Sequence, residues 1–143
     1  MMRIFVTGVA GFVGTHLAHH CLSEGDEVYG TVRPGGRPGP AGVRIAEADV
    51  RDAAALVAAL RQARPEAVVH LAGWAATAAS REHPVRAMDM NAGGTINLLH
   101  AVAGAAPAAF VVVIGSADQY GAVKPDEVPI REEQPFRPIT PYG

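Results

Sequence analysis

Short apolar runs alternate with longer stretches of helical spacing along most of the chain. The apolar runs predict buried strands at Arg3–Thr7, Glu27–Val32, Val43–Ala46, Ala67–Leu71 and Phe110–Ile114. The stretches between them predict helices at Phe12–Glu24, at Ala53–Ala63 and from Pro84 to about Ala103. Gly25 is a stop signal for the first helix, Asp52 a cap for the second and Pro65 its end.

The predicted strands contain continuous apolar runs instead of a regular alternation of apolar and polar residues. Val111-Val112-Val113-Ile114, for example, contains no polar side chain, which is typical of a parallel sheet covered by helices on both faces. Right-handed crossovers then give a doubly wound parallel α/β sheet of the Rossmann type. At this length we expect residues 1–143 to form one domain.

The stretch Gly121–Pro141 breaks this pattern. It has mixed charges and five prolines, at positions 125, 129, 135, 138 and 141. A loop of this length inside a compact domain is usually functional or disordered. We therefore expect residues 121–141 to form a proline-rich loop on the substrate side of the domain.

Composition narrows the class of protein. The chain is 49% hydrophobic and 18% charged, with a net charge of −2, which gives no electrostatic basis for binding nucleic acid or an anionic membrane. No apolar run approaches the roughly 18 residues of a membrane span. The only cysteine, Cys21, cannot form an internal disulfide and fits a reducing compartment, so we expect a cytoplasmic protein.

Three glycines at positions 8, 11 and 14 join the first predicted strand to the first predicted helix. In such a turn, the first glycine permits the tight bend, the second lets the backbone approach a pyrophosphate, and the third allows close contact between helix and strand. Amide groups at the helix start then hold the phosphates. We assign to this cofactor-binding turn Gly8, Ala10, Gly11, Phe12, Val13 and Gly14.

The end of the second predicted strand bears on the choice of cofactor. NAD enzymes usually place an acidic residue there, on the ribose 2′-hydroxyl, but this region reads Gly30-Thr31-Val32-Arg33. Arg33 is well placed for a 2′-phosphate, and Arg37 could assist it from the loop. The alternative is that Arg33 is a solvated loop charge. NADP(H) is favoured, and NAD(H) remains possible.

Further segments follow the glycine turn in a recognisable order. They are Asp49-Val50, His70-Leu71-Ala72-Gly73, Asn91, Gly94-Thr95-Ile96-Asn97-Leu98-Leu99, Gly115-Ser116-Ala117-Asp118-Gln119-Tyr120-Gly121 and Pro141-Tyr142-Gly143. With these segments the sequence resembles, over essentially its whole length, the extended short-chain dehydrogenase/reductases of the NAD(P)-dependent epimerase/dehydratase group. The resemblance implies cofactor contacts from Asp49, Val50, Leu71, Ala72, Gly73 and Asn91.

The resemblance also implies hydride transfer between a nicotinamide and a sugar carbon. Tyr142 matches the tyrosine of the family's Y-x-x-x-K motif, which acts as acid/base. Ser116 matches the residue that orients the substrate oxygen, and Asp118 falls where a dehydratase carries a glutamate. Because the motif's lysine would come at the fourth position after Tyr142, we expect the chain to be an inactive fragment. It would lack the later strands and the small substrate domain.

Within the family, the likeness is greatest to the GDP-sugar branch. The segments 27–33 and 128–142 resemble GDP-4-dehydro-6-deoxymannose reductase, which implies reduction of a GDP-4-keto-6-deoxy sugar. GDP-mannose 4,6-dehydratase and UDP-sugar 4-epimerase are alternatives, since Trp74, Ala117 and Gln119 depart from the reductase pattern. A non-catalytic NAD(P)-binding module is an alternative of another class. The complete protein is expected to bind a nucleotide sugar and to form a homodimer.

Histidines on the first predicted helix raise the question of a metal. His16 and His20 have i, i+4 spacing, which could bind a metal ion. No acidic partner motif accompanies them. We therefore expect no metal site, and we expect His70 to be a buried, hydrogen-bonded structural residue.

Overall fold

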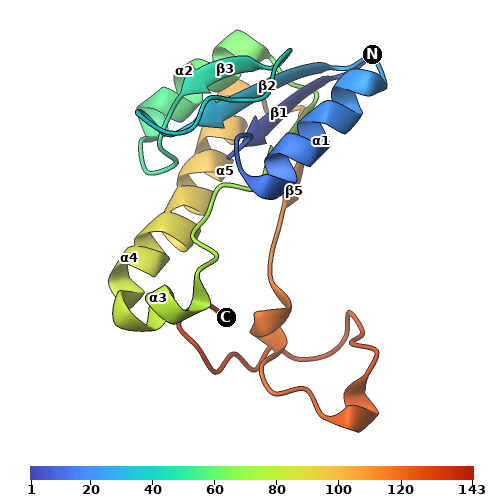
Figure 1. Ribbon diagram of the computed structural model, residues 1–143, viewed down its shortest axis with the longest axis vertical. Coiled ribbons are helices and arrows are strands. Elements are labelled where there is room, and N and C mark those ends of the chain that lie inside the picture. The colour runs from blue at the N-terminus through green and yellow to red at the C-terminus, as the bar shows by residue number, and fades with distance from the viewer.

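Five parallel strands form one sheet at the centre of the molecule (Figure 1). The structure is a computed structural model that describes all residues from 1 to 143. The strands are β1 (Arg3–Thr7), β2 (Glu27–Val32), β3 (Arg44–Glu47), β4 (Ala67–His70) and β5 (Phe110–Val113). Their spatial order is β3-β2-β1-β4-β5, and every neighbouring pair is parallel. The predicted doubly wound α/β fold is therefore confirmed.

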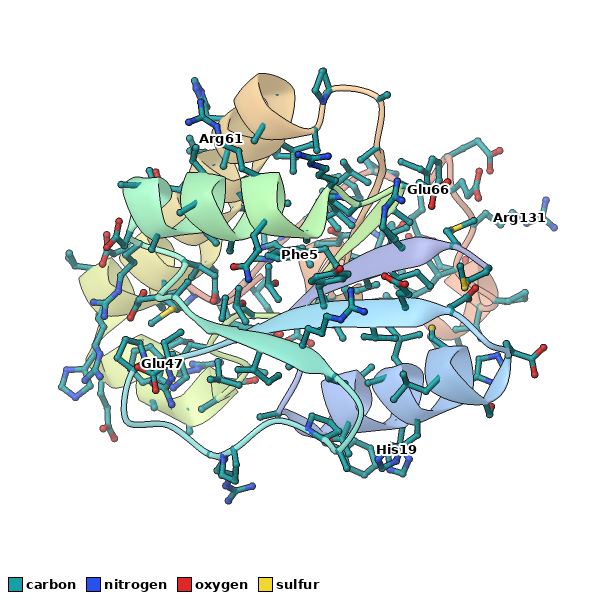
Figure 2. All side chains as sticks on the ribbon, turned by 90° about the horizontal axis from the view of Figure 1, so that it is seen from above. Phe5, His19, Glu47, Arg61, Glu66 and Arg131 are labelled. Atoms are coloured by element: carbon teal, nitrogen blue, oxygen red, sulfur yellow. The ribbon has the colours of Figure 1, made fainter.

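Helices cover both faces of the sheet, as Figure 2 shows. Helix α1 (Phe12–Ser23) lies on one face, and α2 (Ala53–Ala63) and α5 (Gly94–Ala105) lie on the other. Because successive strand residues point to opposite faces, β1 contributes to two separate cores. Phe5 packs with residues of α2 and α5, whereas Ile4 and Val6 pack with residues of α1.

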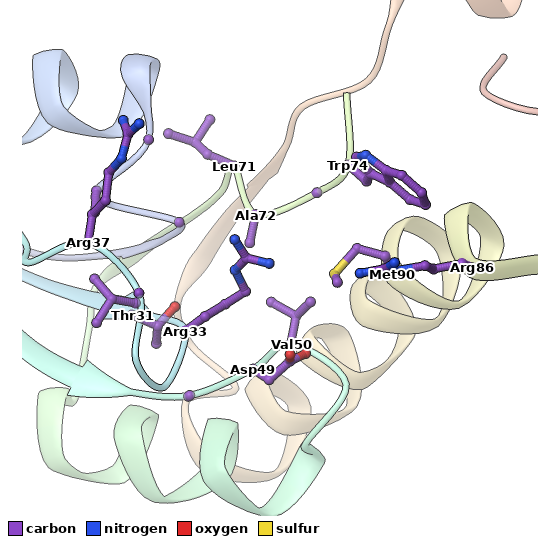
Figure 3. Close-up of a pocket in the computed structure, with 17 residues that line it drawn as sticks. Thr31, Arg33, Arg37, Asp49, Val50, Leu71, Ala72, Trp74, Arg86 and Met90 are labelled. Carbon is purple, nitrogen blue, oxygen red and sulfur yellow. The ribbon is translucent and has the colours of Figure 1, made fainter. Parts of the chain in front are cut away.

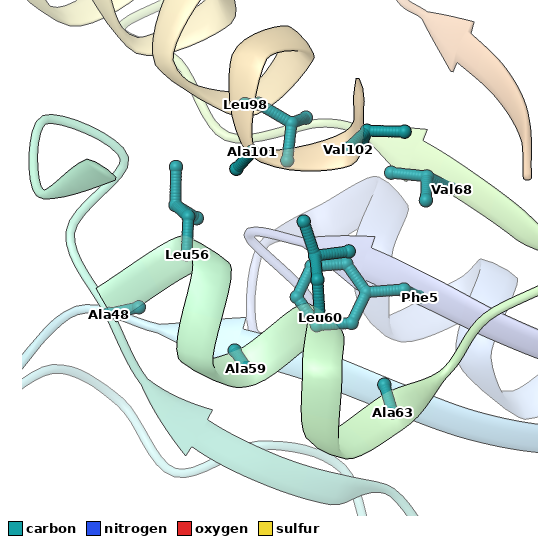
Figure 4. Close-up of a cluster of buried hydrophobic side chains, with 10 residues drawn as sticks. All are labelled: Phe5, Ala48, Leu56, Ala59, Leu60, Ala63, Val68, Leu98, Ala101 and Val102. Carbon is teal, nitrogen blue, oxygen red and sulfur yellow. The ribbon is translucent and has the colours of Figure 1, made fainter. Parts of the chain in front are cut away.

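The larger core lies between the sheet and the α2–α5 pair (Figure 4). Phe5 of β1 lies beside Leu60 of α2, and Leu56 and Leu98 are also fully buried there. Burial of such side chains stabilises a fold by roughly 1.5–3 kcal/mol each. This core fixes α2 and α5 against the strands whose ends carry the candidate site.

Signals at the helix ends act as the sequence predicts. The Asp52 carboxylate accepts a hydrogen bond from the backbone N–H of Ala55 at 3.0 Å and caps α2. Gly25 follows α1 with a φ of +83°, a left-handed conformation that favours glycine. The predicted helix boundaries are correct for α2 and differ by one residue at the end of α1.

The predicted long helix from Pro84 to about Ala103 is not one regular α-helix. It comprises α4 (Pro84–Met88), a π-helical turn (Asp89–Gly93) and α5. The Thr95 hydroxyl donates to the Asn91 backbone carbonyl at 2.6 Å, and such side-chain bonds compete with the regular helical ladder. A short helix that the sequence did not predict, α3 (Thr77–Glu82), precedes α4.

After β5 the chain leaves the sheet and folds back on itself (orange to red in Figure 1). This segment has 3₁₀ turns at Ala117–Tyr120 and Pro125–Glu127. Its two arms meet where the backbone N–H of Arg137 donates to the Gln119 carbonyl at 2.9 Å. The rings of Tyr120 and Phe136 also contact edge to face, with their centroids 5.3 Å apart.

No helix in the chain is both long and apolar enough to cross a membrane.

Candidate functional site

A cavity of about 520 Å³ lies at the carboxyl ends of the central strands (Figure 3). It receives residues that follow β1, β2, β3 and β4. The order of the strands reverses beside β1, which has β2 on one side and β4 on the other. In open α/β sheets, ligands bind at this switch point. The fold therefore places the cavity where a ligand is expected.

The glycine turn forms one wall of the cavity. Gly8, Ala10 and Gly11 line it. Gly8 has a φ of +70°, and a Cβ there would lie 3.0 Å from backbone atoms of Ala72. A Cβ on Gly14 would lie 2.5 Å from the Gly8 carbonyl oxygen. The first glycine therefore permits the bend, and the third permits close packing of α1 on the turn.

Helix α1 begins at this wall without a side-chain cap. Gly11 is its N-cap residue, so no side chain accepts the amide groups of the first turn. Phe12 and Val13 point outward and their side chains are exposed. Neither residue lines the cavity, so their predicted part in cofactor binding can come only from backbone amides.

Two arginines line the cavity beyond the end of β2. Arg33 follows the strand directly and Arg37 comes from the next loop. In Figure 3 the Arg33 side chain points toward Ala72 from the strand end. No carboxylate follows Val32 at the position that binds a ribose 2′-hydroxyl in NAD enzymes. This corner of the cavity therefore suits an anion.

Asp49 and Val50 line the opposite side after β3. Arg51 binds both carboxylate oxygens of Asp49, with Nε 3.0 Å from Oδ1 and Nη2 2.8 Å from Oδ2. These hydrogen bonds lower the pKa of Asp49 to about 2, with a smaller contribution from the charge of Arg33. The only carboxylate in the cavity is thus ionised and already paired with a cation.

The segment after β4 forms the third wall. Leu71, Ala72, Gly73 and Trp74 line the cavity. Asn91 does not line it, but its side chain holds this segment. Its Oδ1 accepts from the Trp74 backbone N–H at 2.6 Å, and its Nδ2 donates to the Trp74 carbonyl at 3.2 Å. Asn91 thus positions the wall, and its direct contact with a cofactor remains a prediction.

Several further lining residues were not assigned to the site from the sequence, among them Trp74, Arg86 and Met90. The Arg86 guanidinium lies 5.1 Å from the centroid of the Trp74 ring, and the His83 ring stacks beside it at 6.4 Å. Of these residues, only Trp74 was noted in the sequence, as a departure from the family pattern. Arg86 and Met90 could not be found in this way, because the approach of α4 to the cavity depends on the contacts of Asn91 with Trp74.

The predicted catalytic residues lie outside the cavity. Ser116, Asp118 and Tyr142 belong to the segment after β5, and none lines the cavity. Ser116 Oγ accepts the Asp118 backbone N–H at 3.2 Å. Gly143, the neighbour of Tyr142, packs so closely on Asp118 that an added Cβ would lie 2.5 Å from its carbonyl oxygen. The fold thus brings the serine and tyrosine segments side by side, while their catalytic roles remain predictions.

The lining residues fit a dinucleotide and offer nothing for a metal. Glycines leave the backbone open at a helix start, which suits a pyrophosphate. Arg33 and Arg37, which form no ion pair, line the cavity at the end of β2, and the apolar residues Leu71 and Ala72 line it after β4. No three His, Cys, Asp or Glu side chains are grouped to hold a metal ion.

Residues 4–143 match the NAD dependent epimerase/dehydratase family. The chain belongs to this family. Its members among the curated relatives include a UDP-glucose 4-epimerase of Streptomyces lividans, 36% identical over 99% of the chain and 43% of that protein. A GDP-6-deoxy-D-mannose reductase of Pseudomonas aeruginosa is 33% identical over 99% of the chain and 42% of that protein. The chain thus spans about two fifths of the length of these relatives.

Solved structures of UDP-glucose 4-epimerases share the fold of this chain. A UDP-glucose 4-epimerase from Brucella ovis in complex with NAD superposes with a TM-score of 0.91 and 30% identity, covering 99% of this chain and 43% of that one. The Thermus thermophilus UDP-glucose 4-epimerase, also in complex with NAD, superposes with a TM-score of 0.89 and 35% identity. The match covers 99% of this chain and 46% of that one. Both neighbours hold NAD, and the family to which this chain belongs is NAD dependent.

Proposed function

We propose that the protein carrying this chain reduces a GDP-4-keto-6-deoxy sugar and uses NADPH to do so. The observation that carries the proposal is the end of β2, where Arg33 and Arg37 line the cavity and no acidic residue is present. A 2′-phosphate is the group that distinguishes NADP(H) from NAD(H), and arginine accommodates it. The 33% identity to a GDP-6-deoxy-D-mannose reductase supports the same substrate class.

The proposed chemistry assigns separate roles to Ser116 and Tyr142 of the segment after β5. When bound, the dinucleotide supplies a hydride to the carbonyl carbon of the sugar. Ser116 hydrogen-bonds the carbonyl oxygen and orients it. Tyr142 gives its phenolic proton to that oxygen as the C=O double bond becomes a C–OH single bond. Asp118, whose backbone N–H donates to Ser116 Oγ, is proposed as a further site residue.

A UDP-sugar 4-epimerase is the second candidate, favoured by the identity of 31–36% to several UDP-glucose 4-epimerases. Epimerisation removes a hydride and returns it, so it consumes no reducing equivalent. Reduction consumes one reduced dinucleotide per product. A GDP-mannose 4,6-dehydratase, for which a relative from Sordaria araneosa is 30% identical over 97% of the chain and 27% of that protein, is a third candidate. Dehydration is also redox-neutral overall.

The test uses the complete gene product and follows both cofactor and sugar. With a GDP-4-keto-6-deoxy sugar, we expect NADPH absorbance to fall by one equivalent per sugar reduced, with NADH slower. Interconversion of UDP-glucose and UDP-galactose without net cofactor oxidation would establish the epimerase instead. Binding of NADPH without turnover of any of these sugars would overturn both and leave a non-catalytic binding module.

We include a homodimer in the proposal, because helices α4 and α5 present exposed apolar side chains along their length. Val85, Met88, Ile96 and Leu99 are all exposed there, and a second copy of the chain could cover them. Light scattering coupled to gel filtration of the complete gene product should give a dimer. Leu99→Glu should give a monomer, whereas Val128→Glu, an exposed apolar residue of the C-terminal segment, should not. A monomeric unmodified protein would contradict this part.

A further inference from the structure

Hydrogen bonds connect the cavity wall after β4 to the buried imidazole of His70. The Thr7 hydroxyl accepts the backbone N–H groups of Leu71 and Ala72 at 3.2 and 3.1 Å. The same hydroxyl lies 2.6 Å from Nδ1 of His70. On the other side of the ring, Nε2 lies 3.1 Å from the Thr95 hydroxyl. The imidazole thus bridges β1 and α5.

The series of bonds returns to the same wall through the π-helical turn. The Thr95 hydroxyl donates to the Asn91 carbonyl at 2.6 Å, and the Asn91 side chain holds the Trp74 backbone by two hydrogen bonds. Thr7 is 0% exposed and His70 only 4%, so water does not replace these partners readily. One network therefore holds residues 71–74 at both ends.

The position of each proton follows from counting donors and acceptors. The Thr7 oxygen has two lone pairs, and the N–H groups of Leu71 and Ala72 use both. Its own proton must therefore go to Nδ1 of His70, which has to be unprotonated. The remaining ring proton is on Nε2 and is donated to the Thr95 hydroxyl, whose proton goes to Asn91. Every donor has an acceptor only when His70 is neutral.

A second proton on the ring has no acceptor in this network. Protonated Nδ1 would point its N–H at the Thr7 hydroxyl, whose lone pairs are already taken. Either the ring bond or the bonds to Leu71 and Ala72 must then break. Those two residues line the cavity, so the cost appears at the ligand site.

We infer that His70 is a positioning residue that couples its protonation to the cavity. In its neutral form it holds residues 71–74 in place for the dinucleotide, and in its protonated form it releases them. For the ligand, the inference rests on the proposed binding of a nicotinamide dinucleotide. For the wall itself, it rests on the hydrogen-bond geometry alone.

The surroundings of His70 contain no competing charge. β1 presents Thr7 to the ring, β5 pairs Val113 with it in register, and α5 presents Thr95. None of these side chains titrates. Burial alone lowers the pKa of His70 below its ordinary value, which agrees with a ring kept neutral near neutral pH.

The first test measures the conformation of residues 71–74 without any ligand. Trp74 is the only tryptophan of the chain, so its fluorescence reports on this segment. Because His83 stacks on the indole, the measurement is made with His83→Gln present. Between pH 8 and 5, we expect a transition with a midpoint below about 6.5, the ordinary histidine value. It should vanish when His70→Gln is added, because glutamine accepts and donates without titrating. It should persist when the exposed His16 is changed to Gln.

A second measurement needs no variant and so does not depend on how a variant folds. In two-dimensional NMR of the unmodified chain, the backbone amide shifts of Leu71, Ala72 and Trp74 should titrate together with the His70 ring. If the ring titrates while these amides and the Trp74 fluorescence do not move, the inference is overturned. A fluorescence transition that remains with His70→Gln overturns it as well.

The third measurement concerns the ligand. Calorimetry with NAD⁺ avoids a 2′-phosphate, which would titrate in the same range. We expect the dissociation constant to rise about tenfold per pH unit below the pKa of His70, and to lose most of this dependence with His70→Gln. An unchanged pH profile in that variant overturns the coupling to the ligand. Failure of any dinucleotide to bind would instead count against the proposed function and leave the fluorescence result standing.

Discussion

Individual residues divide the cavity into a neutral backbone wall and a cationic corner. Gly8 and Gly11 line the cavity without side chains, and Arg33 and Arg37 supply charge at the end of β2. The sequence predicted these roles because each depends on residue type at a fixed distance from a strand end. It could not predict the role of Arg86, whose place in the wall depends on how α4 approaches Trp74.

Arg33→Ala should weaken binding of NADP⁺ far more than binding of NAD⁺. A hydrogen bond to a charged group contributes about 1.5–3 kcal/mol, so the dissociation constant for NADP⁺ should rise about tenfold or more. Calorimetry on both dinucleotides measures the difference. Arg61→Ala, in the last turn of α2 and away from the cavity, should change neither constant. An equal rise of the dissociation constants for NADP⁺ and NAD⁺ in Arg33→Ala would show that Arg33 does not bind the 2′-phosphate.

At the scale of elements, contacts made by single side chains decide where regular structure changes. The sequence predicted the boundaries of all five strands to within one residue, because continuous apolar runs are a local signal. It missed α3 and the π-helical turn. The turn accompanies hydrogen bonds between the Asn91 side chain and the Trp74 backbone and between the Thr95 hydroxyl and the Asn91 carbonyl. No periodicity in the sequence records contacts of this kind.

The packing of α1 on the glycine turn gives an element-scale prediction. Gly14→Ala would place a Cβ 2.5 Å from the Gly8 carbonyl oxygen, and overpacking of this kind costs about 1–3 kcal/mol of unfolding free energy. Gly104→Ala, in α5, would meet nothing within 4 Å and should stabilise by about 0.4–1 kcal/mol. Urea denaturation measures both. Equal effects of the two substitutions would show that close helix–turn packing is not important.

At the scale of the whole molecule, the domain joins the cavity at the strand ends to a separate C-terminal segment. The sequence predicted that Ser116 and Tyr142 would need the fold to bring them together, and their two segments do meet around Asp118. The sequence provided no means of placing Ser116 and Tyr142 relative to the cavity, because the chain between β5 and Tyr142 forms only short 3₁₀ turns and loops. That placement depends on long-range contacts.

The stability of the whole chain should fall on acidification in two ranges. Because burial lowers the pKa of His70 from its ordinary 6.5, protonation favours the unfolded chain, and stability falls as the pH drops below 6.5 toward the folded-state pKa. The lowered pKa of Asp49 contributes stability above its ordinary 3.8 that is lost as the pH falls toward about 2.

Urea denaturation at several pH values, with matched variants, separates the two ranges. His70→Gln should flatten the first, and Arg51→Ala, which removes the partner of Asp49, should reduce the second. The exposed His16→Gln should alter neither. A first range that persists in His70→Gln would assign it to another group.

Calorimetric titration of the chain with NADP⁺ and with NAD⁺ tests the cofactor site most directly. We expect one dinucleotide bound per chain, with NADP⁺ bound more tightly because of Arg33 and Arg37. Tighter binding of NAD⁺ would contradict the cofactor preference and favour the redox-neutral epimerase. Binding of neither would contradict the central claim that this cavity is a nicotinamide dinucleotide site.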